Sequence, residues 1–345
     1  MKTFQGACTF LFVLLLSACQ KNGTASPDKP PVIADTSFIT KGADVSWLTQ
    51  MEQSGVKFYN AAGVSMDCME LLQDLGINAI RLRVWVNPVG GWNGNADVVQ
   101  KALRAKKLGL RILIDFHYSD SWADPGKQTK PAAWAAYDFP TLTDTVYSYT
   151  LSVLDTLKSN GIVPSWVQIG NETNDGMLWP DGKASVNMAN FSALVKAGYK
   201  AVKEINDSIK VIVHISNGYD NDLFRWIFDG LKTNGAQWDI IGMSLYPSAS
   251  NWQSYNDSCV ANMKDMISRY GKQVMICEVG MPADQAAVCQ SFLTDIIKKT
   301  KSIPGHNGLG VFYWEPESYN NWQGYGLGAF DNTGKPTVAM NAFSN

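Results

Sequence analysis

Short apolar runs alternate with longer amphipathic segments along most of this chain. The short runs are rich in β-branched and aromatic residues and are bounded by glycine, proline or polar residues, which is typical of strands. We predict strands at residues 39–46, 78–86, 111–118, 166–171, 210–216, 240–246, 273–279 and 308–314. The longer segments repeat their apolar positions at helical spacing, which predicts helices that include residues 97–108, 141–160, 187–206, 223–234, 255–270 and 284–299.

The order of these elements predicts the fold class. Strands that alternate with helices form a parallel sheet, and eight such repeats favour an α/β fold made of a single (β/α)8 TIM barrel. Gly76 and Gly109 each follow a leucine-containing turn, as the glycines that end helices do. An open doubly wound sheet is the alternative, but no glycine-rich phosphate loop follows the first strand. No linker is visible after residue 38, so we expect residues 38–345 to form one domain.

The first residues carry a targeting signal. Lys2 precedes the apolar run 10–16, which is too short to span a bilayer and fits the core of a signal peptide. This run ends in Leu-Ser-Ala-Cys19, which resembles the lipobox of bacterial lipoproteins and implies cleavage before Cys19 and lipidation of its thiol. We therefore expect a lipoprotein signal peptide at residues 1–18, a flexible tether at 19–37 and an exported protein anchored to a membrane at the cell surface or in the periplasm. An ordinary signal peptide with an incidental cysteine is the alternative.

Composition narrows the classes of function. The formal net charge of −2 gives no electrostatic reason to bind nucleic acid or an anionic membrane surface. The 12 tryptophans are more than a core of this size needs, and tryptophan is favoured where a flat apolar face such as a sugar ring is gripped. No segment argues for a subunit interface, so a monomer is the default expectation.

Four cysteines remain after residue 19, at positions 68, 259, 277 and 289. Their spacing is not that of a metal site, so we expect no metal. An exported chain can oxidise its cysteines, and Cys259 and Cys289 lie early in two successive predicted helices. A disulfide between these two is therefore a hypothesis, whereas Cys277 fits a small buried core residue.

Polar residues gather at the carboxyl ends of the predicted strands, where barrel enzymes hold their chemistry. Glu172 and Glu278 each end an apolar run, where a carboxylate is costly unless it is paired or functional. They lie on the fourth and seventh strands, on opposite sides of a barrel mouth, and a pair of carboxylates is the standard apparatus for cleaving a glycosidic bond. Further polar or aromatic residues occupy other strand ends, namely Asp44, Arg81, Arg83, Trp85, His117, Asp120, Asn171, Tyr246 and Trp314.

The arginines and the histidines of this pattern differ in their surroundings. Arg81, Arg83 and Trp85 alternate along one strand and so point to one side, where buried arginines need carboxylate partners. His117 sits beside acidic residues at a strand end, whereas His214 and His306 have no such context and are interpreted as structural or surface residues.

Residues 115–134, DFHYSDSWADPGKQTKPAAW, closely resemble the hallmark segment of glycoside hydrolase family 53, the endo-β-1,4-galactanases. Segments 42–46, 81–85, 170–172 and 314–316 are similar to other segments of that family. The resemblance covers essentially the whole chain after the tether. It implies a barrel enzyme that cuts within β-1,4-linked galactan, the side chain of type I arabinogalactan in pectin.

The resemblance also implies roles for individual residues. Glu172 would be the general acid/base and Glu278 the nucleophile of a retaining enzyme, and Asn171 would hold the sugar 2-hydroxyl. Tyr246 and an arginine, Arg81 or Arg83, would position and ionise Glu278. The remaining members of the expected site are Asp44, Trp85, His117, Asp120, Trp122 and Trp314. The alternatives are another retaining barrel endo-glycanase, acting on mannan or glucan, and a surface glycan-binding lipoprotein without catalysis.

One departure from the family concerns the segment after Glu278. Some bacterial members carry a long loop there that helps to bind calcium, but here Glu278 is followed by the short Val-Gly-Met-Pro-Ala-Asp before a predicted helix. The resemblance therefore carries over no calcium site. We expect no cofactor and no nucleic-acid partner, with a galactan polysaccharide as the substrate.

Overall fold

The structure is a computed structural model in which residues 1–3 and 39–344 are described. The predicted tether, the lipidation site Cys19 and all but the first three residues of the predicted signal peptide lie outside the described residues. Within residues 1–3 and 39–344, no helix is both long enough and apolar enough to cross a membrane.

Eight parallel strands close into a barrel, which confirms the predicted (β/α)8 fold. The strands are β1 (Thr40–Asp44), β4 (Ala79–Val84), β5 (Arg111–Phe116), β6 (Trp166–Ile169), β7 (Lys210–Ile215), β8 (Ile240–Leu245), β9 (Gln273–Val279) and β10 (Gly308–Trp314). Each strand pairs with the next in the chain, and β1 closes the ring by pairing with both β4 and β10. All eight predicted strands are present, although most are shorter than predicted by one to three residues.

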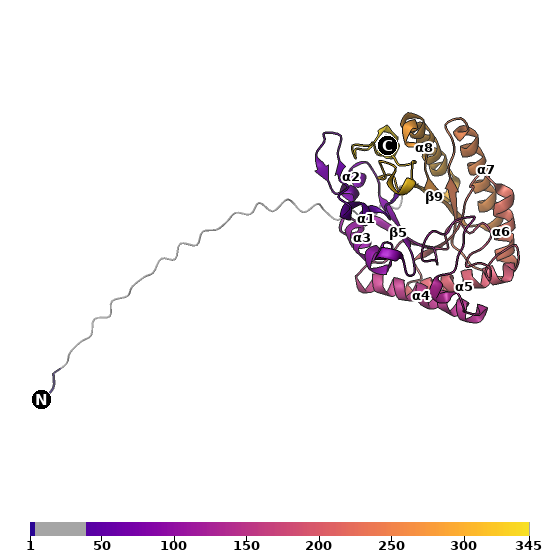
Figure 1. Cartoon of the computed structure of the whole chain (residues 1–345), viewed down its shortest axis with the longest axis horizontal. Helices are drawn as coiled ribbons and strands as arrows, with labels where there is room; N and C mark the ends of the chain where they lie inside the picture. The colour runs from indigo at the N-terminus through magenta and orange to yellow at the C-terminus, as the bar shows by residue number, and fades with distance from the viewer. Residues whose placement is uncertain (4–38, 345) are drawn as a thin grey trace. The chain divides into compact units, whose positions relative to one another are not determined.

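Helices form the outer layer of the barrel (Figure 1). They are α3 (Asn95–Lys107), α4 (Phe139–Ser159), α5 (Met188–Ile205), α6 (Asn221–Thr233), α7 (Trp252–Tyr270) and α8 (Ala286–Lys301), which match the six predicted helices. Local signals fix their ends: the Asp138 carboxylate caps the first turn of α4 by accepting from Thr141 N, and α7 stops at Gly271 with φ 62°.

Several small elements between β1 and β4, and around the barrel, had no predicted bounds, although Gly76 indicated the helix end that follows Asp74. Helices α1 (Leu48–Gln53) and α2 (Cys68–Asp74) flank a two-stranded hairpin of β2 (Phe58–Tyr59) and β3 (Ser65–Met66). Short 3-10 turns lie at Val89–Gly91, Ala132–Trp134, Ala283–Gln285, Pro304–His306, Trp322–Gly324 and Val338–Phe343. These segments are too short to show a periodic apolar pattern in the sequence.

The inside of the barrel is layered. An apolar layer of Ala79, Leu113, Trp166, Ile212, Ile240, Met275, Cys277 and Phe312 fills one level of the interior. Gly42 belongs to this level because a Cβ there would lie 2.0 Å from the Phe312 ring. Two residues further along most of these strands, on the same face, the side chains become polar. The apolar layer thus forms a floor beneath a polar layer at the carboxyl ends of the strands.

The hypothesis of a disulfide between Cys259 and Cys289 is wrong. Both thiols are free and buried in the described part of the chain, as are Cys68 and Cys277. Cys259 on α7 packs against Gly218 in the segment after β7, whereas Cys289 on α8 lies 3.7 Å from the Tyr313 hydroxyl of β10. The two helices therefore direct these cysteines towards different strands of the barrel, and a bridge between them is not formed.

Candidate active site

The polar layer opens into a cleft of about 620 Å³ at the carboxyl ends of the strands. Both glutamates line it together with Trp47, Trp85, His117, Trp122, Asn171, Tyr246 and Trp314. Most of the predicted strand-end residues are thus brought to one place, although they come from strands distant in sequence.

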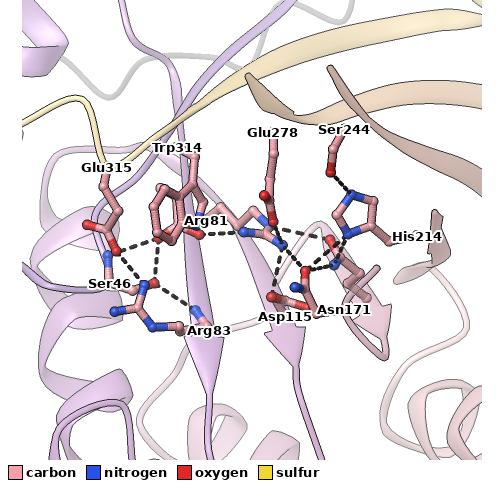
Figure 2. Close-up of polar contacts among 12 residues, drawn as sticks. Ser46, Arg81, Arg83, Asp115, Asn171, His214, Ser244, Glu278, Trp314 and Glu315 are labelled. Carbon is pink, nitrogen blue, oxygen red and sulfur yellow. Dashed lines mark hydrogen bonds and ion pairs between the residues drawn. The ribbon is translucent and has the colours of Figure 1, made fainter. Parts of the chain in front are cut away.

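Glu278 sits at the end of β9 and is held by two donors. Its Oε1 lies 2.8 Å from Arg81 Nη2, and its Oε2 accepts a 2.8 Å hydrogen bond from the Tyr246 hydroxyl. Arg81 also binds Asp44 at 2.6 Å and Asp115 at 2.9 Å, and all three of these side chains are fully buried. Figure 2 shows Arg81 between Glu278, Asp115 and Asn171. Of the two arginines left open by the sequence, the partner of Glu278 is Arg81.

A tight turn after β6 presents Asn171 and Glu172. Gly170 has φ 83°, and a Cβ on it would lie 2.5 Å from the Thr173 side chain, so only glycine fits there. Glu172 itself adopts a left-handed φ of 45°, which costs free energy and is common at functional sites. Asn171 is fixed in orientation, since its Oδ1 accepts from Arg81 at 2.9 Å and its Nδ2 donates to Ala123 O at 2.8 Å.

The two glutamates share an electrostatic environment. Burial raises the pKa of Glu172 to about 7 and also raises the pKa of Glu278. The negative charge of Glu172 also raises the pKa of Glu278, while Arg81 lowers the pKa of both. One proton is therefore retained by the pair at neutral pH. The direct contacts with Arg81 and Tyr246 favour Glu278 as the carboxylate that is ionised and Glu172 as the one that keeps the proton.

His117 connects the cleft wall to the charged layer. Its Nδ1 accepts from Trp85 Nε1 at 3.2 Å and from the backbone amide of Ala123 at 3.1 Å. Its Nε2 therefore carries the proton and points at Asp115 Oδ2, 3.0 Å away. Asp120, by contrast, does not line the cleft: its carboxylate accepts from the backbone amides of Asn87 and Ala132 and so ties two loops together.

Arg83 organises an aromatic wall instead of contacting Glu172 or Glu278. Its guanidinium carbon lies 5.1 Å from the Trp47 ring, 5.2 Å from Trp85 and 4.4 Å from Trp122. Nη1 pairs with Glu315, and the Trp47 amide also donates to Glu315 at 3.2 Å (Figure 2 draws the Arg83–Glu315 contact). Trp314 packs on the same cluster, with its ring 5.1 Å from Trp47 and 5.7 Å from Trp122.

A barrel mouth with two glutamates, an adjoining asparagine, a buried arginine and an aromatic wall is the layout that the sequence resemblance implied. The family model described as glycosyl hydrolase family 53 matches residues 40–343. The chain belongs to glycosyl hydrolase family 53. The predicted family is thereby confirmed.

Similar proteins within family 53 agree with this placement. An arabinogalactan endo-β-1,4-galactanase from Humicola insolens is 34% identical over 317 residues, which cover 85% of this chain and 93% of that protein. A solved fungal β-1,4-galactanase is 30% identical with a TM-score of 0.82, covering 89% of this chain and 99% of that one. A family 53 catalytic domain from Ignisphaera aggregans is 31% identical with a TM-score of 0.81, covering 91% of this chain and 98% of that one.

Several residues of this family 53 site were not predicted. Gln168, Ser244, Glu315 and Glu317 are buried in or beside the polar layer. His214, interpreted from the sequence as structural or surface, is fully buried and contacts Asn171 and Ser244, whereas His306 is exposed as expected. Gln168 and His214 stand two residues after Trp166 and Ile212 of the apolar layer, and this spacing is the signal that could have found them.

No group of three or more His, Cys, Asp or Glu side chains among the described residues could hold a metal ion. The acidic residues of the polar layer are instead matched to Arg81 and Arg83. In this arrangement one carboxyl group can donate a proton to a substrate while a second carboxylate attacks it as a nucleophile.

Proposed function

We propose that the protein is a retaining endo-β-1,4-galactanase. The observation that carries the proposal is the pair of buried glutamates in one cleft of a family 53 barrel, where Arg81 and Tyr246 both contact Glu278. Relatives with more than 30% identity bear the name arabinogalactan endo-β-1,4-galactanase, and this supports β-1,4-galactan as the substrate.

The mechanism uses the two carboxyl groups in two steps. Glu172 protonates the departing glycosidic oxygen while the Glu278 carboxylate attacks the anomeric carbon, and a covalent galactosyl-enzyme forms. Water deprotonated by Glu172 then attacks the same carbon and releases the sugar with retained configuration. A retaining enzyme places its carboxyl groups about 5–5.5 Å apart, which is consistent with the mutual influence of the two pKa values.

The surrounding residues would bind and orient the sugar. The Asn171 amide, fixed by Arg81 and by Ala123 O, is suited to a hydrogen bond with the 2-hydroxyl next to the reacting carbon. Trp85, Trp122 and Trp314 present indole surfaces to the cleft, on which the apolar face of a galactose ring can pack. His117 keeps Trp85 and Asp115 in place.

Product analysis tests this function. Soluble protein lacking residues 1–19 is incubated with linear β-1,4-galactan, mannan and cellulose, and the products are sized over time. Short galacto-oligosaccharides from galactan, with little free galactose at early times and the β-anomer formed first by NMR, are expected. Release of oligosaccharides from mannan or cellulose but not from galactan would indicate that the protein is a different endo-glycanase. Tight retention on galactan without release would indicate a binding protein.

Export and lipid anchoring form a second part of the proposal. The support is the sequence Leu-Ser-Ala-Cys19 after an apolar run, which resembles a lipobox. The mature chain would then begin at a lipid-modified Cys19 and act as a membrane-anchored monomer at the cell surface or in the periplasm. Incorporation of labelled palmitate into the full-length chain, and its loss in Cys19→Ala, is the expected result. Label retained in Cys19→Ala would refute the anchor without touching the enzymatic proposal.

A further inference from the structure

A series of buried side chains leads from Arg81 towards Glu172 beneath the cleft. Arg81 Nε donates to Gln168 Oε1 at 3.3 Å. Gln168 Nε2 lies 2.8 Å from His214 Nδ1, and His214 Nε2 lies 2.8 Å from Ser244 Oγ. Figure 2 shows His214 between Ser244 and Asn171. Gln168 and His214 are fully buried and Ser244 is 1% exposed, so these groups depend on one another for their hydrogen bonds.

The direction of each hydrogen bond follows from the fixed end of the series. A guanidinium can only donate, so Gln168 turns its carbonyl oxygen to Arg81 and its NH2 group to His214. The backbone amide of Glu172 also points at His214 Nδ1, at 3.4 Å. Asn171 Oδ1 is 3.1 Å from the same nitrogen, but this oxygen already accepts from Arg81 and Gln168. His214 Nδ1 is therefore an acceptor.

His214 is consequently a neutral imidazole with its proton on Nε2. Burial and the positive charge of Arg81 hold the pKa of His214 well below its usual range, so the ring stays neutral across the working pH of an enzyme. The Nε2–H donates to Ser244 Oγ. Since that oxygen accepts from His214, the single proton of the Ser244 hydroxyl is free for another acceptor.

The candidate acceptor of the Ser244 proton is Glu172. Ser244 stands opposite Glu278 in the register of β8 and β9 and two residues before Tyr246, on the inner face of the barrel. Hydrogen bonding by the Ser244 hydroxyl lowers the pKa of Glu172. We propose that Ser244 is a positioning residue for the acid/base, its hydroxyl oriented by neutral His214 so that it donates to the ionised Glu172. This inference rests on the function proposed above.

Such a donor acts when the charge on Glu172 changes. Each time Glu172 gives its proton to the leaving oxygen, a carboxylate appears in a buried place, and a hydroxyl already pointing at it stabilises that charge. Glu172 is then a stronger acid than burial alone would make it. The same donor holds the carboxylate in place while it deprotonates water in the second step.

Other charged or titratable groups also face Glu172. Arg81 lowers its pKa, whereas Asp115 and Asp124 raise it. Glu278 and Tyr246 interact with it across the cleft, the first as a like charge and the second as a neutral phenol. All of these groups stay in place when only the Ser244 hydroxyl is removed, so a Ser244 variant isolates the one contact of interest.

The test is the pH profile of kcat/KM on β-1,4-galactan for Ser244→Ala. Losing a donor to the ionised form raises the pKa of Glu172, so the basic limb should move to higher pH by about one unit, the size expected for one hydrogen bond to a charged group. An aryl galacto-oligosaccharide with a nitrophenol leaving group needs little protonation, and its turnover should fall less than that of the polymer. Ser244→Thr keeps the hydroxyl, so the basic limb of its pH profile should lie at the same pH as in the wild type.

A buried serine outside the series supplies the matched control. Ser216 is 5% exposed, directly follows β7, and uses its hydroxyl to accept from Asn174 at 2.6 Å. Ser216→Ala should leave the basic limb where it is. An unmoved basic limb in folded Ser244→Ala, or an equal shift in Ser216→Ala, would overturn the inference.

Two further results remain decisive. If Ser244→Ala does not fold, Ser244→Cys takes its place, because a thiol is a weaker donor than a hydroxyl. A basic limb of the pH profile that stays at the wild-type pH in Ser244→Cys would also overturn the inference. The wild-type protein could also release nothing from galactan but cleave mannan. If Ser244→Ala then shifts the basic limb of the pH profile on mannan, the role of Ser244 stands and only the proposed substrate fails.

Discussion

Arg81 and Glu278 form a buried ion pair, with 2.8 Å between the guanidinium Nη2 and the carboxylate Oε1. The same guanidinium binds Asp44 and Asp115, so one positive charge faces three carboxylates. Burial favours the protonated form of Glu278, while Arg81 lowers its pKa. Arg81 is therefore the contact that opposes protonation of the proposed nucleophile, and it also balances the charges of Asp44 and Asp115.

Replacing Arg81 should damage both stability and activity. Arg81→Met leaves Asp44 and Asp115 buried without a counter-charge, and we expect a loss of about 3–5 kcal/mol in the free energy of unfolding. In the fraction that folds, a protonated Glu278 should lower kcat by about 10²-fold or more. Urea unfolding and galactan turnover measure the two effects.

A surface arginine is the control for Arg81. Arg269 pairs with Asp229 at 2.8 Å with both side chains more than 40% exposed, so Arg269→Met should cost about 0–1 kcal/mol and leave turnover unchanged. Equal losses in the two variants would mean that the Arg81 charge has no special role.

The buried thiols lead to a second prediction. Burial raises the pKa of Cys259 and Cys277 to about 12 and that of Cys289 to about 11, so these thiols are protonated and shielded at pH 8. In protein lacking residues 1–19, a thiol reagent should label none of the four remaining cysteines in the native state and all four after unfolding without a reductant. Two unreactive cysteines in the unfolded chain would instead reveal a disulfide.

The sequence predicts correctly which side chains of this site face the barrel interior and which lie at strand ends, because both follow from the strand pattern. The inward side of β4 is visible in the alternation of Arg81 and Arg83, but the choice of partner is not. Barrel closure places Asp44 opposite Arg81 in the register between β1 and β4, and this long-range pairing directs Arg81 to the charged layer. Arg83, one pleat further on, reaches Glu315 instead.

His214 shows why the rest of the site stays hidden in a single sequence. Within its own strand it is one polar residue in an apolar run, which favours a structural interpretation. Its partners Gln168 and Ser244 lie 46 and 30 residues away on two other strands. The disulfide hypothesis failed for a related reason, since proximity of two helices along the chain does not determine which strand each cysteine faces.

A third prediction concerns stability and pH. Burial and the charge of Glu315 hold the pKa of Glu317 well above its usual range, and burial raises the pKa of Glu172 to about 7. The folded protein keeps these protons at pH values where the unfolded chain, with a carboxyl pKa of about 4.3, has lost them. Unfolding then releases protons, so the free energy of unfolding should fall as pH rises from about 5 to 8.

Glu317→Gln checks this assignment because a carboxamide of similar shape does not titrate. The variant should show a smaller fall in the free energy of unfolding between pH 5 and pH 8 than the wild type, measured by urea denaturation at both pH values. The exposed Glu70→Gln serves as the control and should keep the wild-type pH dependence. An unchanged pH dependence in Glu317→Gln would show that Glu317 is already ionised in the folded protein.

The aromatic wall gives a fourth prediction. Arg83 packs against three tryptophans and pairs with Glu315, but it does not contact either proposed catalytic glutamate. Arg83→Lys should therefore loosen the positions of Trp47, Trp85 and Trp122 and raise KM for galactan more than it lowers kcat. Steady-state kinetics on the polymer separate the two parameters. A fall in kcat alone would place Arg83 in the chemical step.

The roles of the two glutamates can be separated by the product that each variant forms with azide. Glu172→Ala and Glu278→Ala should both fold and lose almost all activity on galactan. With an aryl galacto-oligosaccharide as substrate, Glu172→Ala still forms the covalent intermediate, because a good leaving group needs no acid. Azide should then attack this intermediate and give the β-galactosyl azide. In Glu278→Ala the space left by the carboxylate admits azide on the opposite face, so the product should be the α-azide. NMR of the anomeric proton distinguishes the two, and exchanged anomers between the variants would reverse the assignment of acid/base and nucleophile.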